Sequence, residues 1–538
     1  MLRSQTTLAI ALLLCTACTG KLDGGQPAAP NTPNTPNTPN TPVPATPGDR
    51  LMRRVTALEY AQSVQDVLEV APAGELPADV RVLGFSRVGA GTTSINPLAA
   101  EQYENVAHEL ARRAFSDSAR ARRLSGCTPT GVADQACART AIGRIGARLF
   151  RRTLTEAELT LYSQLTLDAA AHVGSFDGGL SLAVSGMLQS PRFLNQVEVG
   201  EAMPGSTTRR RYTDYEMAAR LASFVWNSVP DQALLDAAAG GELVTDDGLR
   251  TQLTRMLADA RARKAITALM IEHFDIELLE TAVPNVGATV GIASAMREEL
   301  SRVLETAIFD EPATKFRDLF TRDSTFVNAQ LATHYGLTPP GGSGFERVSL
   351  PANRRGILSL GAVLASHGHG GRTSPTLRGL FVRQRLMCTS IPGPPANVST
   401  DVPINSGATA RIRLMRHNTD PSCAGCHLQM DPIGFGFEQF DAVAAFRTQE
   451  GGETIDPSGD LDSVAFADAA SLGVALSQNQ GIEACMARNL FRAAAGRREA
   501  PSELSVFNSS RLPTGGLTVS QLIEYVILSE PFRSFQSQ

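Results

Sequence analysis

The chain has 538 residues, of which 43% are apolar and 19% are charged, and its formal net charge is −5. These values are ordinary for a soluble protein, and the length allows two to four domains with hydrophobic cores. The sequence contains neither a block of basic residues nor aromatic residues interleaved with basic ones. This composition argues against nucleic acid as a partner.

The N-terminus predicts export. An apolar run over residues 8–14 is too short to span a bilayer and is typical of a signal peptide. Small residues then lead into Cys18, so residues 1–18 resemble a bacterial lipoprotein leader in which Cys18 becomes lipidated. Cys15 departs from that pattern, and cleavage without lipidation is the alternative. We expect a protein of the periplasm or cell surface, held to the outer membrane by its lipid rather than by a spanning helix.

A linker follows the leader. Residues 19–48 are rich in Pro, Thr and Asn, and Asn-Thr-Pro is repeated four times over residues 31–42. Such a sequence buries nothing, so we expect it to be disordered and extended, at about 3.1 Å per residue. It would separate the membrane anchor from the folded body.

Beyond the linker, apolar residues recur at spacings of three and four, which predicts a succession of helices. Two of them begin with a capping box, formed by Thr155 with Glu158 and by Thr213 with Glu216. Sustained strand alternation is absent, so the predicted fold class is mostly α, built from several helical modules. We expect helices over residues 58–70, 98–115, 136–150, 155–171, 213–226, 246–258, 262–279, 293–309 and 324–335, and a last amphipathic helix over 484–495.

The most informative motif is C-x-x-C-H, formed by Cys423, Cys426 and His427. Two thiols at this spacing add across the vinyl groups of a haem, and the adjacent histidine binds the iron. Half of a zinc site and a redox dithiol are the alternatives. No second C-x-x-C or H-x-x-x-H completes a zinc site, and nothing nearby indicates a thioredoxin-like unit. We therefore predict one covalently attached haem c.

The sixth iron ligand must approach from the face opposite His427. Met430 is only three residues further along, which counts against it. His417, six residues before the motif, is our first choice, and an open iron site is the next. His367 and His369 are further candidates, although surface or capping roles explain many single histidines.

Several charged residues near the motif have two interpretations. The guanidinium groups of Arg372, Arg411 or Arg413 suit haem propionates. Arg372, however, also precedes a Ser-Pro helix start. Asp431 and Asp441 lie close to the motif, where loop capping and turn roles explain both.

Four cysteines remain besides those of the leader and the motif, and they allow three pairings. Cys127 and Cys137 flank a short loop and form the obvious local pair, worth roughly 2.8 kcal/mol by loop entropy. Cys388 would then pair with Cys485, worth roughly 4.7 kcal/mol on the same model. Two free buried thiols are the alternative for this second pair.

Different short motifs are spread along the chain from the linker to the C-terminus. Examples are residues 51–54, 150–155, 188–193, 326–328, 372–375, 423–427, 431–435, 438–441 and 485–497. In these motifs the chain resembles exported planctomycete and myxobacterial cytochrome c-like proteins, which are built from several domains of unknown function. The resemblance implies a haem-bearing module near the C-terminus and a histidine at position 417, and it implies no defined activity.

We accordingly expect the folded body to be divided into helical modules, one of which carries the haem. The expected modules are residues 49–120, 134–200, 210–337, 345–450 (haem-bearing) and 460–538.

The leading functional hypothesis is an exported, lipid-anchored c-type haem protein that carries electrons or binds a redox partner. The alternatives are a haem oxidoreductase with an open iron site, and a structural or adhesive surface protein whose haem is incidental. The sequence contains no nucleophile elbow, phosphate-binding Gly loop or paired-carboxylate cleft, so no catalytic residue is assigned.

Overall fold

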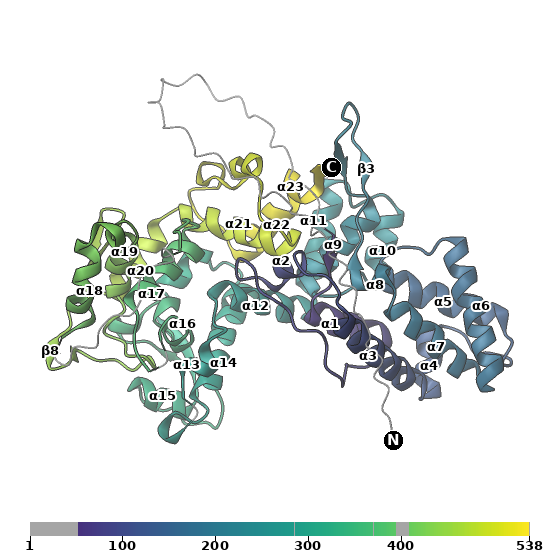
Figure 1. Cartoon of the computed structure of the whole chain (residues 1–538), viewed down its shortest axis with the longest axis horizontal. Helices are drawn as coiled ribbons and strands as arrows, with labels where there is room; N and C mark the ends of the chain where they lie inside the picture. The colour runs from purple at the N-terminus through teal and green to yellow at the C-terminus, as the bar shows by residue number, and fades with distance from the viewer. Residues whose placement is uncertain (1–51, 285, 370, 394–407, 537–538) are drawn as a thin grey trace, which may run out of the picture. The chain divides into compact units, whose positions relative to one another are not determined.

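Helices dominate the structure, a computed structural model (Figure 1). They account for about 59% of it, which confirms the mostly α fold class. The predicted signal peptide, Cys18 and the linker lie outside the described residues, so those expectations stay predictions. The structure describes residues 52–284, 286–369, 371–393 and 408–536, without the side chains of residues 288, 416–418 and 422.

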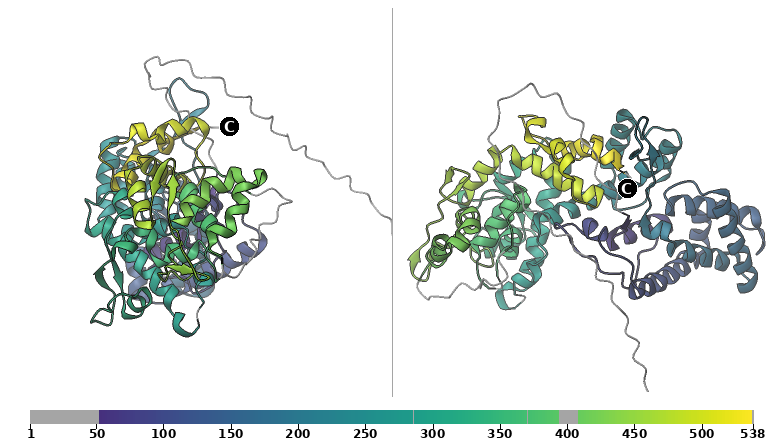
Figure 2. Two further views of the ribbon diagram at one scale, coloured as in Figure 1. Left: turned by 90° about the vertical axis from the view of Figure 1, so that its left-hand side faces the viewer. Right: turned by 45° about the horizontal axis from the view of Figure 1, so that its top comes forward.

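The helices follow one another along the chain, and both turned views show their dominance (Figure 2). Those before residue 230 are α1 (Ala57–Leu68), α2 (Ser86–Ala90), α3 (Pro97–Phe115), α4 (Ser118–Ser125), α5 (Gln135–Leu149), α6 (Glu156–Val173), α7 (Phe176–Leu188), α8 (Pro191–Leu194) and α9 (Asp214–Trp226). Those that follow are α10 (Gln232–Ala239), α11 (Asp246–Leu257), α12 (Ala260–Phe274), α13 (Leu279–Ala282), α14 (Ile292–Glu305), α15 (Ala329–Tyr335), α16 (Gly361–Ser366), α17 (Pro375–Phe381), α18 (Ala410–Thr419), α19 (Pro421–Phe435), α20 (Ala469–Gln478), α21 (Gly481–Ala495), α22 (Val519–Leu528) and α23 (Glu530–Arg533). The π-helical segments η2 (Thr306–Asp310) and η6 (Val382–Leu386) extend α14 and α17.

The strands of the described residues are short and pair antiparallel. Strand β11 pairs with β4, so Ser534 lies opposite Arg211 and the C-terminal segment joins a sheet formed much earlier in the chain. The strands are β1 (Arg53–Arg54), β2 (Asn195–Gln196), β3 (Glu201–Ala202), β4 (Arg209–Arg211), β5 (Ser324–Val327), β6 (Glu346–Ser349), β7 (Gln449–Glu450), β8 (Glu453–Thr454), β9 (Gly459–Leu461), β10 (Val464–Phe466) and β11 (Ser534–Gln536).

Both predicted capping boxes are confirmed. The Thr155 hydroxyl accepts from the Glu158 backbone N–H at the start of α6, and the Glu158 carboxylate accepts from the Thr155 N–H. Thr213 and Glu216 form the same pair at the start of α9. Each box satisfies two backbone donors that the first turn of a helix leaves unpaired.

The helix predicted over residues 324–335 is wrong in its first part. Residues Ser324–Val327 form β5 instead, which pairs with β6. Thr325, Phe326 and Val327 favour strands, and pairing with a segment about twenty residues later decides the outcome. The Thr325 hydroxyl also donates to the buried carboxylate of Glu299 at 2.7 Å.

Two other predicted helices have different bounds in the structure. The one expected over residues 262–279 ends at Phe274, because Asp275 adopts a left-handed conformation and terminates α12. The one expected over residues 484–495 begins earlier, as α21, and it is not the last, since α22 and α23 follow it.

The buried side chains form two hydrophobic clusters. One gathers residues between Val55 and Val229 and lies mainly among α1, α3, α5 and α7. The other extends from Phe85 to Phe535 and includes α9, α12, α14 and the C-terminal helices α21 and α22. The second contains Trp226 and buries most of α9.

A buried ion pair joins segments near both clusters. Arg53 donates to the Glu59 carboxylate at 2.6 Å and to the Gln196 side chain at 2.6 Å. Ser223 on α9 donates to the same carboxylate at 2.6 Å. Arg53 and Arg87 hold the pKa of Glu59 well below its usual value, although burial alone would raise it. Arg53, in the motif formed by residues 51–54, thus has a structural role in this buried ion pair.

Candidate haem-binding site

Helix α19 carries the C-x-x-C-H motif in its first turns. Pro421 occupies its first position, where a missing N–H costs little. Cys423, Cys426 and His427 are spaced i, i+3 and i+4, so they share one face of the helix. Both thiols are partly exposed and stand outside the two disulfides, and the His427 side chain is 20% exposed. The motif therefore presents its reactive groups at the surface of the helix.

A buried carboxylate holds the histidine of this motif. His427 Nδ1 lies 2.9 Å from Asp431 Oδ2, one helical turn further along. The Asp431 side chain is 0% exposed. Its other oxygen accepts a hydrogen bond of 2.7 Å from the Thr376 hydroxyl on α17. Because this arrangement uses Nδ1, iron ligation would take place through Nε2 of His427.

Two glycines allow α17 to lie directly on α19. A Cβ atom at Gly379 of α17 would collide with the Met430 carbonyl oxygen. One at Gly434 of α19 would collide with the Pro375 carbonyl oxygen. Backbone therefore meets backbone, and this contact brings Thr376 within reach of α19.

Arg378 of α17 anchors the chain that follows α19. Its guanidinium donates to the carbonyl oxygens of Phe437, at 2.8 Å, and Phe440, at 3.0 Å. It also forms a buried ion pair with Glu438. The Thr373 hydroxyl donates to the same carboxylate at 2.7 Å. Burial raises the pKa of Glu438, and Arg378 opposes that rise.

The structure describes the side chains of the candidate sixth ligands Met430 and His367, but not that of His417. Met430 is 6% exposed and lies on α19 itself, the same helix as His427. His367 Nδ1 lies 2.7 Å from the Val363 carbonyl oxygen, and its ring stacks on Phe381. Burial lowers the pKa of His367 to about 4.

His417 lies on α18, which contacts α19, but its side chain is outside the described residues. His369 pairs through its backbone with Arg372. The assignment of His417 as sixth ligand stays a prediction.

Exposed apolar side chains lie on α18 and on α19, two helices that contact each other. Ile412 and Met415 on α18 are 50% and 57% exposed, and Leu428, directly after His427, is 57% exposed. Since a haem macrocycle is largely apolar, covering such side chains would be favourable. The exposed apolar side chains of these two helices, the two thiols and the imidazole beside Asp431 all fit a covalently attached haem.

The arginines considered for the haem propionates already have protein partners. Arg411 donates to the Asp456 carbonyl oxygen at 3.1 Å and stacks on Phe435. Arg413 forms an ion pair of 2.9 Å with Glu450. A role with propionates stays a prediction for both.

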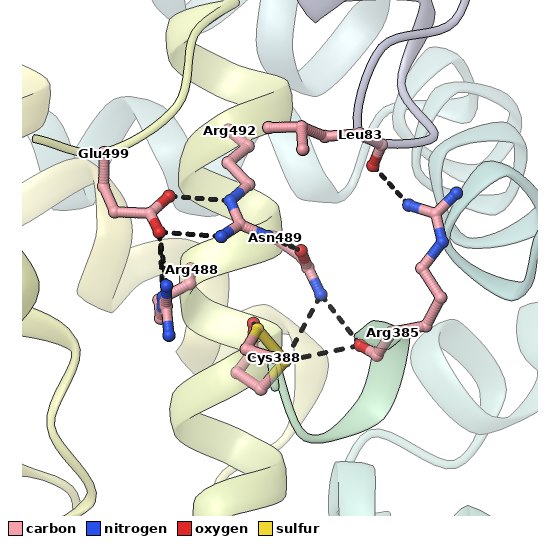
Figure 3. The surroundings of a disulfide bond; sticks show 8 residues. Leu83, Arg385, Cys388, Arg488, Asn489, Arg492 and Glu499 are labelled. Carbon is pink, nitrogen blue, oxygen red and sulfur yellow. Dashed lines mark hydrogen bonds and ion pairs between the residues drawn. A yellow bond between two sulfur atoms is a disulfide. The ribbon is translucent and has the colours of Figure 1, made fainter. Parts of the chain in front are cut away.

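Both predicted disulfides are confirmed. Cys127 and Cys137 are joined with a Cα–Cα distance of 5.7 Å, and Cys388 and Cys485 with 5.4 Å. The second bond links the end of the segment that follows α17 to α21, as Figure 3 shows. Asn489 of α21 strengthens this link by donating to the Arg385 carbonyl oxygen at 2.9 Å (Figure 3).

Within the described ranges, no group of three or more His, Cys, Asp or Glu side chains is arranged to hold a metal ion. In the same part of the chain, no helix is both long and apolar enough to cross a membrane.

Four family models match successive parts of the chain. PSD3 (protein of unknown function, DUF1587) matches residues 53–116, PSD5 (DUF1595) residues 137–198, PSD4 (DUF1592) residues 212–337 and PSCyt3 (DUF1588) residues 354–450. This combination is the known pattern of one group. The chain belongs to the planctomycete cytochrome c-like multidomain proteins. No curated protein matches it significantly, and no solved structure does either.

The PSCyt3 match covers the residues that form the candidate site. It contains α17, α18 and α19, and with them Cys423 to His427 and Asp431. Its name points to a cytochrome-like domain in this part of the chain. Sequence reasoning found the motif but missed the contacts of Asp431, Thr376 and Arg378. The spacing of His427 and Asp431, four residues apart, was the available signal for the first of these contacts.

Proposed function

We propose that this protein is an exported, lipid-anchored c-type haem protein that carries electrons or binds a redox partner. The observation that carries the proposal is the oriented C-x-x-C-H face of α19, where His427 is held through Nδ1 beside two thiols. When bound, the haem supplies one-electron chemistry at its iron.

The chain's own residues would attach and orient the haem. The thiols of Cys423 and Cys426 each add to a vinyl group: S–H and the C=C π bond are lost, and S–C and C–H bonds form. No atom leaves and no oxidant is required. His427 would bind the iron through Nε2, while Ile412, Met415 and Leu428 would lose exposed apolar surface.

Export is the setting in which this attachment is plausible. Two disulfides between described residues support an oxidising compartment. The lipid anchor at Cys18 and the outer membrane as location rest on the sequence of the leader. Mass spectrometry of the mature N-terminus tests this part: a chain that begins elsewhere than a lipidated Cys18 contradicts it.

The main experiment is expression with a c-haem maturation system, followed by a denaturing gel stained for haem. We expect a stained band for the wild type and none for the double variant Cys423→Ala/Cys426→Ala. The double variant Cys127→Ala/Cys137→Ala is the matched control, because it also removes two sulfurs and should keep its haem. Loss of all haem from the wild type on denaturation would contradict covalent attachment.

An oxidoreductase with an open iron site is the second candidate. Met430 lies on α19, the same helix as His427, and this favours an open site over a carrier that uses Met430 as sixth ligand. Optical spectra distinguish the two: low-spin bands in both redox states indicate six-coordinate electron transfer, and high-spin ferric haem indicates an open site. Protein without a Soret band would instead support a structural or adhesive role.

A further inference from the structure

Asp431 is a buried carboxylate whose two oxygens face different helices. Oδ2 accepts from His427 Nδ1 within α19, at 2.9 Å, and Oδ1 accepts from the Thr376 hydroxyl of α17, at 2.7 Å. With its side chain 0% exposed, this carboxylate receives its stabilisation from protein donors. A capping or turn role, as expected from sequence, does not describe a residue in the body of α19.

The position of this carboxylate is set by the contact between two helices. Spacing of four residues places His427 and Asp431 on the same face of α19. Thr376 reaches the carboxylate because Gly379 lets α17 approach the backbone of α19. The Asp431 side chain is therefore held from outside its own helix, and its direction determines that of the imidazole.

We propose that Asp431 is a positioning residue for the haem ligand: it fixes the tautomer and ring plane of His427 and makes its Nε2 a stronger electron donor to iron. This inference rests on the proposed function. A carboxylate that accepts the second N–H of a ligating imidazole raises the basicity of the ligand. A more basic axial ligand stabilises ferric over ferrous iron, so Asp431 lowers the reduction potential of the haem.

The test is the midpoint potential of the haem-loaded full chain, measured by spectroelectrochemical titration in the wild type and in Asp431→Asn. We expect the ferrous-to-ferric ratio at a fixed applied potential to rise about tenfold in the variant, which corresponds to about 59 mV for one electron. Asp441→Asn is the matched control. It removes a carboxylate of the same module that accepts from the backbone N–H groups of Val443 and Ala445, at 2.9 and 2.8 Å.

Thr376→Val provides a second measurement of the potential. This variant keeps the Asp431 carboxylate and the shape of the Thr376 side chain, so it should disturb folding less than Asp431→Asn. Without the hydroxyl, more negative charge remains on the carboxylate to polarise His427, so we expect the potential to fall. A potential unchanged in Asp431→Asn, an equal rise in Asp441→Asn, or a rise in Thr376→Val would each overturn the inference. If Asp431→Asn does not load haem, the direction of the shift in Thr376→Val decides. A wild type without covalent haem would refute the proposed function itself, whereas a loaded protein with unchanged potentials refutes only the role of Asp431.

Discussion

Removal of the Cys388–Cys485 disulfide is expected to destabilise the folded body by roughly 4–5 kcal/mol. The bond joins residues 97 apart in sequence, and closing such a loop restricts the unfolded chain by about 4.7 kcal/mol. Cys485 is 2% exposed on α21 and Cys137 is 5% exposed on α5, so alanine at either pair also removes a buried sulfur, and the difference between the two pairs reflects loop length. The hydrogen bond from Asn489 to Arg385 remains and keeps the local contact.

The control is Cys127→Ala/Cys137→Ala, whose bond spans only 10 residues and is worth roughly 2.8 kcal/mol on the same reasoning. Guanidinium unfolding of the oxidised proteins measures the unfolding free energy that each double variant loses. Circular dichroism follows the unfolding of the whole chain. Fluorescence of Trp226, the single tryptophan, reports on the larger cluster, to which α21 also belongs. A loss from the long-loop variant no greater than that from the short-loop variant would refute the loop-entropy argument.

Two further predictions concern buried groups. Gly379→Ala should cost roughly 3 kcal/mol in unfolding free energy and weaken haem loading, because its Cβ would collide with the Met430 carbonyl oxygen. The control is Gly143→Ala, which has room for a Cβ and should be neutral or slightly stabilising. Equal effects of the two would contradict the proposed helix contact. Burial raises the pKa of Glu299 to about 7, so the unfolded chain loses this proton first and stability falls as the pH rises from about 4.5 to about 7. The unfolding free energy of the wild type should fall by roughly 3 kcal/mol across that pH range, and Glu299→Gln should remove this fall. An equal dependence of unfolding free energy on pH in variant and wild type would contradict the prediction.

Local patterns in the sequence predicted most of the helices and the chemistry of α19. Capping boxes at Thr155 and Thr213 act within one turn, so two residues three positions apart contain the whole signal. The C-x-x-C-H spacing likewise places its three side chains on one face of any helix. The first disulfide is also local, and the second followed from the two cysteines that remained.

The failures come from contacts with distant segments. The helix predicted over residues 324–335 included residues 324–327, but these form a strand that is stabilised by residues 346–349, which a local pattern does not include. Asp431 was interpreted as a turn residue because its burial could not be seen in the sequence. Its second partner, Thr376, lies 55 residues earlier.

The sequence by itself determined that the chain is mostly helical and that it carries a c-type attachment motif, and it predicted the two disulfides that the structure confirms. Only the tertiary structure decided that α17 lies on α19, and therefore that a buried carboxylate orients His427. The physical reason is that this contact depends on two glycines, Gly379 and Gly434, each facing backbone from the other helix. Close packing between segments so far apart depends on the shape of both surfaces at once, and no periodicity along either segment encodes it.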